Sequence, residues 1–73
     1  MPKLPIVSGA EAVRALEHVG FNVVRQRGSH IVLRRGSAGC VIPSHRELKI
    51  GTLSGILKQA GVSADEFITA LKT

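Results

Sequence analysis

The stretch that decides the fold is Arg-Gln-Arg-Gly-Ser-His-Ile-Val-Leu-Arg-Arg, residues 25–35. Gly28 separates two segments of β-compatible residues, and a glycine in such a place is typical of the turn of a β-hairpin. The stretch contains four arginines and one histidine but no acidic residue. It therefore predicts a hairpin with a surface that faces phosphate.

The neighbouring segments extend this hairpin into a sheet. Residues 21–26 are rich in β-branched side chains and predict the first strand, and residues 29–35 predict the second. A second turn is expected over residues 36–39, which are Gly, Ser, Ala and Gly, with a short third strand at 40–43. We expect three antiparallel strands in chain order.

Helical patterns lie on both sides of this sheet in the sequence. Apolar residues at helical spacing predict one helix over residues 9–19, ended by Gly20, and a second helix ended by Gly61. A short third helix should close the chain. Its start and that of the first helix carry capping-box spacings, Ser63 with Glu66 and Ser8 with Glu11.

The order α-β-β-β-α-α predicts a single two-layer α+β domain over residues 1–73. Its helices should cover one face of the three-stranded sheet, and the other face should stay open. With 73 residues, an apolar core is only just sufficient to hold such a domain without a metal or disulfide.

The charge distribution indicates a polyanionic partner. The chain has ten Lys and Arg residues against five Asp and Glu residues, a net charge of +5, and no acid lies between His18 and Arg46. Clustered basic charge favours nucleic acid, because neutralising phosphates releases counterions. RNA or DNA is therefore the first partner to consider.

Other composition features narrow the class of protein. The single cysteine, Cys40, can form no internal disulfide, which fits a reducing cytoplasm. The sequence offers no apolar run long enough for a membrane helix, no leader pattern and no His/Cys set at metal spacing. We expect a cytoplasmic protein with no metal, small-molecule cofactor or membrane contact.

His30 is the candidate catalytic residue. If Ile31 and Leu33 face the helices, strand alternation places His30 and Arg34 on the open side, although Val32 on that side makes it less uniformly polar. An imidazole titrates near neutrality and can transfer a proton in RNA cleavage. The alternative is a strand histidine that only bonds to a neighbour.

Further residues are candidates for contacts with RNA. His45 precedes the second helix and is either the missing acid, a phosphate ligand or an ordinary loop histidine, whereas His18 is simply a favourable partner of a helix C-terminus. Alternation means that the four arginines of the central stretch cannot all share one face. The candidates are Arg25, Arg27, Ser29, Arg34, Arg35, His45, Lys49 and Lys58.

The sequence resembles the HicA family of toxins, through four stretches that cover nearly the whole chain in order. They are Leu-Pro-Ile-Val-Ser-Gly at 4–9, Gly-Phe at 20–21, Arg-Gln-Arg-Gly-Ser-His-Ile-Val-Leu at 25–33, and Val-Ile-Pro-Ser-His at 41–45 running into Gly-Thr-Leu-Ser-Gly-Ile-Leu-Lys-Gln-Ala-Gly at 51–61.

The resemblance implies a double-stranded-RNA-binding-domain-like fold with a short extra C-terminal helix. It also implies that the protein is the toxin of a type II toxin-antitoxin system, an endoribonuclease (mRNA interferase) acting on mRNA, with His30 at the position of the catalytic histidine. Its partner would be a HicB-like antitoxin.

Two other functions compete with this one. A non-catalytic module would use the same basic face to bind double-stranded RNA by its shape. A third reading is a domain that mainly holds another protein. A single-strand binder that stacks bases is disfavoured, since the sheet offers only Phe21 as an aromatic platform.

Overall fold

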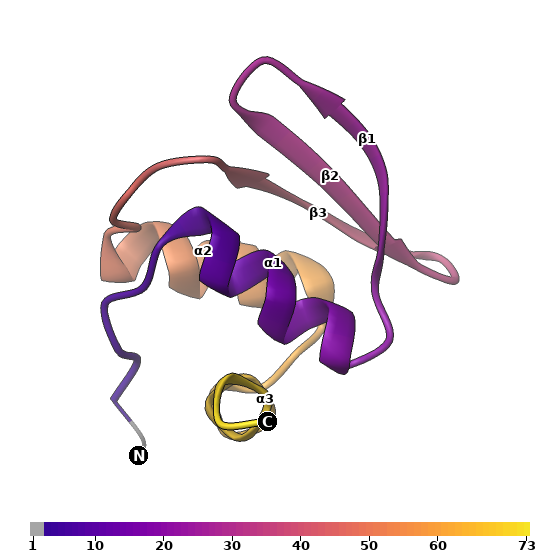
Figure 1. The fold of residues 1–73 in the computed structure, drawn as a ribbon. Helices are drawn as coiled ribbons and strands as arrows, with labels where there is room; N and C mark the ends of the chain where they lie inside the picture. Colours follow the sequence, from indigo (N-terminus) through magenta and orange to yellow (C-terminus); the bar gives the residue numbers. More distant parts are fainter. Residues whose placement is uncertain (1–2) are drawn as a thin grey trace.

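The computed structural model describes residues 3–73 and has the predicted order of elements. Helices α1 and α2 lie against one face of a three-stranded sheet, and α3 packs beneath α1 (Figure 1). The fold is therefore α+β, as expected. The elements are α1 (Gly9–His18), β1 (Asn22–Arg27), β2 (His30–Arg35), β3 (Ala38–Pro43), α2 (Ile50–Ala60) and α3 (Ala64–Leu71).

Both predicted capping boxes are present. The backbone N–H of Glu11 donates to the Ser8 hydroxyl at 3.0 Å, and the Glu11 carboxylate accepts the Ser8 N–H at 2.9 Å. Ser63 and Glu66 repeat the arrangement at the start of α3. Each box satisfies two amides that a helix start leaves without partners, so the local sequence fixes where both helices begin.

The three strands form an antiparallel sheet in the order β1-β2-β3. Two-residue loops, Gly28-Ser29 and Gly36-Ser37, join them, and in each the glycine has positive φ, 56° and 60°. The second loop is shorter than predicted, so β3 begins at Ala38 rather than Cys40. A tight hairpin leaves no room for a longer turn.

Strand β1 contains a bulge at Val24. Val23 pairs with Leu33, but the next pair on β1 is Arg25 with Val32, so one residue of β1 has no partner on β2. A bulge of this kind shifts by one residue which side chains face which side of the sheet.

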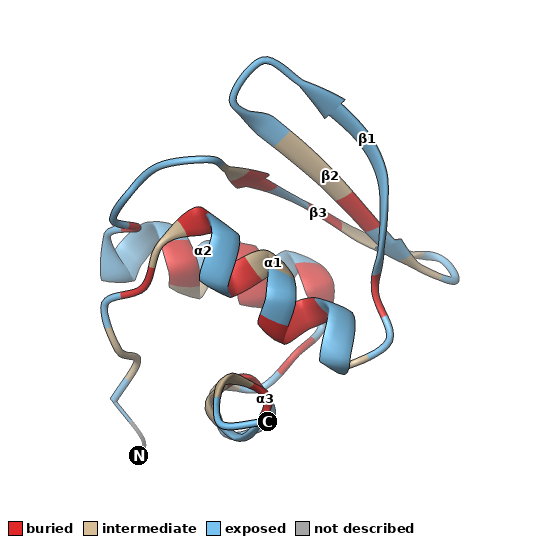
Figure 2. Ribbon diagram, viewed as in Figure 1, coloured by how far each residue is buried: buried red, intermediate tan, exposed pale blue. Residues whose placement is uncertain are grey.

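The core lies between the sheet and the helices. Leu33 of β2 and Ile42 of β3 are fully buried against Leu16 and Leu53, which come from α1 and α2. In Figure 2 the buried residues gather where the helices meet the sheet, whereas β1 is exposed along its length. Phe67 of α3 is also fully buried, which ties this last helix to the rest of the domain.

The glycine of the first hairpin loop provides a stability prediction. A β-carbon at Gly28 would meet no atom within 4 Å, so only the left-handed backbone penalises a side chain there. Gly28→Ala is expected to lower the free energy of unfolding by about 1–2 kcal/mol. Gly55→Ala, in the interior of α2 with equally open space, should raise it by about 0.5–1 kcal/mol.

Urea unfolding of the two variants beside the parent chain measures both effects. Changes of the same sign in the two variants would contradict the assigned backbone conformations.

Candidate nucleic-acid interface

The candidate site is the face of the sheet that the helices leave uncovered, called the open face below. On β2, Ile31 packs against the core and Leu33 is buried, whereas His30 and Arg34 are exposed on the opposite side. The alternation predicted for this strand is thus present. The His30 imidazole is accessible from outside the protein.

Two more arginines, both on β1, lie on the open face. Cross-strand partners share a face of a sheet, and Arg25 pairs with Val32 while Arg27 pairs with His30. The two-residue turn at Gly28-Ser29 sets this register, whereas the bulge at Val24 shifts the pairing only of the β1 residues beyond it, Val23 and Asn22.

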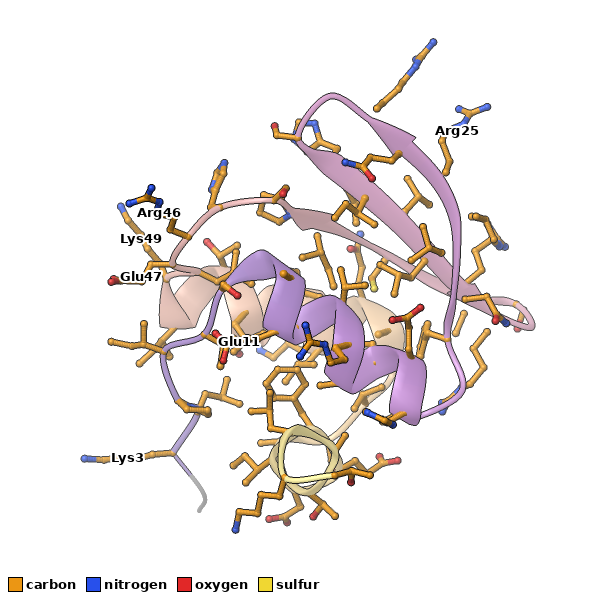
Figure 3. All side chains as sticks on the ribbon, viewed as in Figure 1. Lys3, Glu11, Arg25, Arg46, Glu47 and Lys49 are labelled. Atoms are coloured by element: carbon orange, nitrogen blue, oxygen red, sulfur yellow. The ribbon has the colours of Figure 1, made fainter. Side chains whose placement is uncertain are left out.

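Three of the four predicted arginines therefore accompany His30. In Figure 3 the side chain of Arg25 extends from β1 away from the helices.

Strand β3 adds an apolar border to this face. Val41 pairs with Val32, and Pro43 pairs with His30. Val41 is 40% exposed, which is unusual for a valine in the interior of a strand. The open face is therefore a basic surface crossed by a short apolar strip, as Val32 indicated.

The loop that follows β3 is held against the first hairpin turn. The backbone N–H of Ser44 donates to the carbonyl of Ser29 at 2.6 Å, so this loop begins next to the end of β2 that carries His30. His45, Arg46 and Lys49 of this segment are exposed. Figure 3 shows Arg46 and Lys49 extending from the segment that leads into α2.

Arg46 was not among the candidates predicted from the sequence. The signal that marks it is its place at the end of the acid-free stretch, next to His45.

Arg35 lies on the other side of the sheet. Its guanidinium donates to the carbonyl of Val19 at 2.9 Å, and its Cζ lies 4.8 Å from the centre of the Phe21 ring. These contacts tie the C-terminal end of α1 to β2, and a carbonyl at a helix end is a natural partner for a cation. Arg35 therefore has a structural role and does not accompany His30.

Lys58 is also separate from the open face. It is exposed in the last turn of α2, a helix that packs against β3 from the covered side. The structure does not bring Lys58 together with His30. It remains a candidate only for a contact with a partner that reaches around the edge of β3.

A wider hollow among residues 3–73 lies away from the sheet. It measures about 500 Å³. Its lining residues, which include His18, Asp65 and Glu66, come from α1, from α3 and from the residues just after these helices. No sheet residue lines it. Its lining includes two carboxylates and no lysine or arginine, which is unsuited to phosphate, so we place the candidate site on the open face.

Within residues 3–73 there is no cluster of three His, Cys, Asp or Glu side chains that could hold a metal ion, and no helix is both long and apolar enough to span a bilayer. Cys40 is buried, and burial raises the pKa of its thiol above the ordinary value. A thiol in this environment is not an activated nucleophile.

The raised pKa of Cys40 predicts how stability depends on pH. An unfolded thiol ionises near pH ~8.5, and the buried thiol ionises only at higher pH. Its contribution is therefore complete below about pH 8.5 and is lost as the pH rises through the folded-state pKa. Denaturant midpoints measured on both sides of this pH should fall in the parent chain and fall less in Cys40→Ala.

Comparison with known families agrees with this geometry. The family model described as "HicA toxin of bacterial toxin-antitoxin" matches residues 9–62, which run from the start of α1 to just beyond α2. A comparison with individual curated proteins gives no significant match. Because the matched segment is more than half of the chain and includes the whole open face, the chain belongs to the HicA family of toxins of bacterial toxin-antitoxin systems.

Proposed function

We propose that the protein is an endoribonuclease that cleaves mRNA without a metal ion, with His30 as a general acid or base. The observation that carries the proposal is the exposed imidazole of His30 on one face with the guanidinium groups of Arg25, Arg27 and Arg34. Family membership supplies the biological setting, because the toxin of such a system is paired with an antitoxin that would inhibit it.

RNA cleavage of this kind requires little from the protein. The 2′-hydroxyl of the substrate attacks the adjacent phosphorus, the bond to the 5′-oxygen breaks, and the products are a 2′,3′-cyclic phosphate and a free 5′-hydroxyl. A side chain such as His30 must move a proton, and cations must stabilise the charge that builds on the phosphate. The open face has both kinds of group.

The arginines hold the RNA backbone in this proposal. Guanidinium presents paired donors to phosphate oxygens, and the three open-face arginines flank His30 on β1 and β2. Ser29 adds a hydroxyl in the turn just before His30. The loop after β3 extends the surface with His45, Arg46 and Lys49, and Lys58 contributes only to a larger footprint.

The test is cleavage of a labelled transcript by the purified chain in EDTA. We expect fragments that end in 2′,3′-cyclic phosphate and begin with 5′-hydroxyl, because no metal-bound water takes part. A chain that binds the transcript and leaves it intact under these conditions would support the second candidate, a non-catalytic module for double-stranded RNA. The exposed basic sheet favours that alternative on its own.

A HicB-like antitoxin is the proposed partner, and the proposed location is the cytoplasm, where mRNA is available. The exposed Val41 on the open face favours a protein that covers this surface, since an apolar strip gains from burial. Covering the open face would hide His30. Addition of purified antitoxin is therefore expected to suppress cleavage, and undiminished cutting in the saturated complex would contradict this mode of inhibition.

A further inference from the structure

We propose that His45 performs the second proton transfer of the cleavage reaction, so that His30 and His45 act as a pair on one phosphodiester. The inference rests on the proposed function and adds a second proton-transfer group to it. Cleavage needs one proton taken from the 2′-hydroxyl and another given to the departing 5′-oxygen. His30 alone accounts for one of these transfers.

The backbone places the two histidines close together. Pro43 is the cross-strand partner of His30, and such partners have Cα atoms about 4.5–5.5 Å apart. His45 follows two residues later, after a tight turn in which its N–H donates to the carbonyl of Pro43 at 2.9 Å. Two residues span at most about 7 Å, so the Cα atoms of His30 and His45 lie within about 13 Å of each other.

The loop that carries His45 is fixed on both sides. Its preceding residue, Ser44, donates its N–H to the Ser29 carbonyl at 2.6 Å, one residue before His30, and the His45 carbonyl accepts the Gly9 N–H at 2.8 Å. A β-carbon at Gly9 would collide with the carbonyl oxygen of Pro43, so α1 starts in direct contact with this loop. The first hairpin turn and the start of α1 thus fix the backbone that carries this exposed imidazole.

The surroundings of His45 suit a phosphodiester. With Pro43 it lines a hollow of about 280 Å³, which is also lined by Lys49, Thr52 and Glu47 at the start of α2. Pro43 is also the cross-strand partner of His30, so the hollow and the open face share this residue at the end where His30 lies. A phosphate held between the two histidines would have Lys49 nearby to balance its charge.

The reaction balances with these two groups and the substrate alone. One imidazole, neutral, accepts the proton of the 2′-hydroxyl as its oxygen bonds to phosphorus. The other imidazole, protonated, donates its proton to the 5′-oxygen as the bond from phosphorus to that oxygen breaks. No oxidant, metal or water molecule is consumed in this step.

The experiment uses two matched RNA substrates, one ordinary and one in which sulfur replaces the 5′-bridging oxygen at the cleaved bond. A thiol has a pKa of about 8.5, far below that of a hydroxyl group, so the sulfur leaves without a proton and needs no general acid. His45→Ala and His30→Ala should each cleave the ordinary substrate about 10²- to 10⁴-fold more slowly than the parent chain. The sulfur substrate should restore most of the rate in one of the two variants and not in the other.

That asymmetric rescue also assigns the acid, because only the variant that lacks the acid regains activity. His18→Ala is the matched control, since His18 lies on α1 beside α3 and outside the open face, and it should cleave both substrates as the parent does. Ordinary cleavage by His45→Ala, or an equal response of both variants to sulfur, would overturn the pair. A parent chain that cleaves neither substrate would overturn the proposed function and the pair with it.

Discussion

Replacing His30 by alanine is expected to slow RNA cleavage by about 10²- to 10⁴-fold, the usual contribution of a general acid or base. The fold should be unaffected, because the side chain is exposed at the start of β2. RNA affinity should stay close to that of the parent, since the three open-face arginines remain. Cleavage rates and fluorescence anisotropy with the same labelled RNA measure the two properties separately.

This prediction separates the two candidate functions. A non-catalytic binder has no cleavage to lose, so His30→Ala would change nothing that the assay measures. His18→Ala controls for the loss of any imidazole, because His18 belongs to α1. If His30→Ala cleaved as fast as the parent chain, His30 would have no part in proton transfer.

The local signals of the sequence predict most of the fold. Capping boxes and turn glycines act through neighbouring backbone atoms, and so Ser8, Ser63 and Gly28 produce the same structure that their spacing predicts. The helix stripe of α2 works in the same way, with Leu53 and Leu57 buried as expected. These elements depend on contacts within a few residues, which a sequence displays directly.

The bulge in β1 and the role of Arg35 are harder to predict. Alternation within β1 suggests one set of outward residues, but the register with β2 decides which side Arg25 and Arg27 face. A two-residue turn at Gly28-Ser29 sets Arg27 opposite His30. The length of this turn therefore decides that Arg25 and Arg27 lie on the same face as His30. Arg35 is different, because its partners Val19 and Phe21 become neighbours only through tertiary packing.

The loop that carries His45 shows the same limit. Nothing in its local sequence indicates that Ser44 bonds to Ser29 or that Gly9 bonds to His45. These bonds join residues far apart in the chain, and they exist only after β3 pairs with β2 and α1 packs against the loop. The candidate site therefore combines a hairpin that the sequence predicts with a loop position that it does not.

The second large expected effect concerns RNA binding, because three arginines lie on the open face and Arg35 lies on the opposite side of the sheet. Replacing Arg25, Arg27 and Arg34 together by glutamine should weaken RNA binding strongly and flatten its dependence on salt. Each phosphate contact contributes about 0.9 to the slope of log affinity against log salt on a duplex and about 0.7 on a single strand. Loss of three contacts should reduce the slope by about 2–3.

Arg35→Gln is the control for position, since it removes one guanidinium charge from β2 on the opposite side of the sheet. It should leave the salt slope unchanged but lower the free energy of unfolding by about 1–2 kcal/mol, because the bond to Val19 and the contact with Phe21 are lost. The triple variant should show the reverse pattern, with binding weakened and unfolding little changed, since its side chains are exposed.

Binding titrations at several salt concentrations and urea unfolding of each variant give all four quantities. An equal loss of salt dependence in Arg35→Gln would mean that the affinity for RNA depends on the total charge of the protein rather than on the arginines of the open face. Parent-like binding by the triple variant would remove RNA from this face altogether, because no other surface of the sheet carries three guanidinium groups beside an exposed histidine.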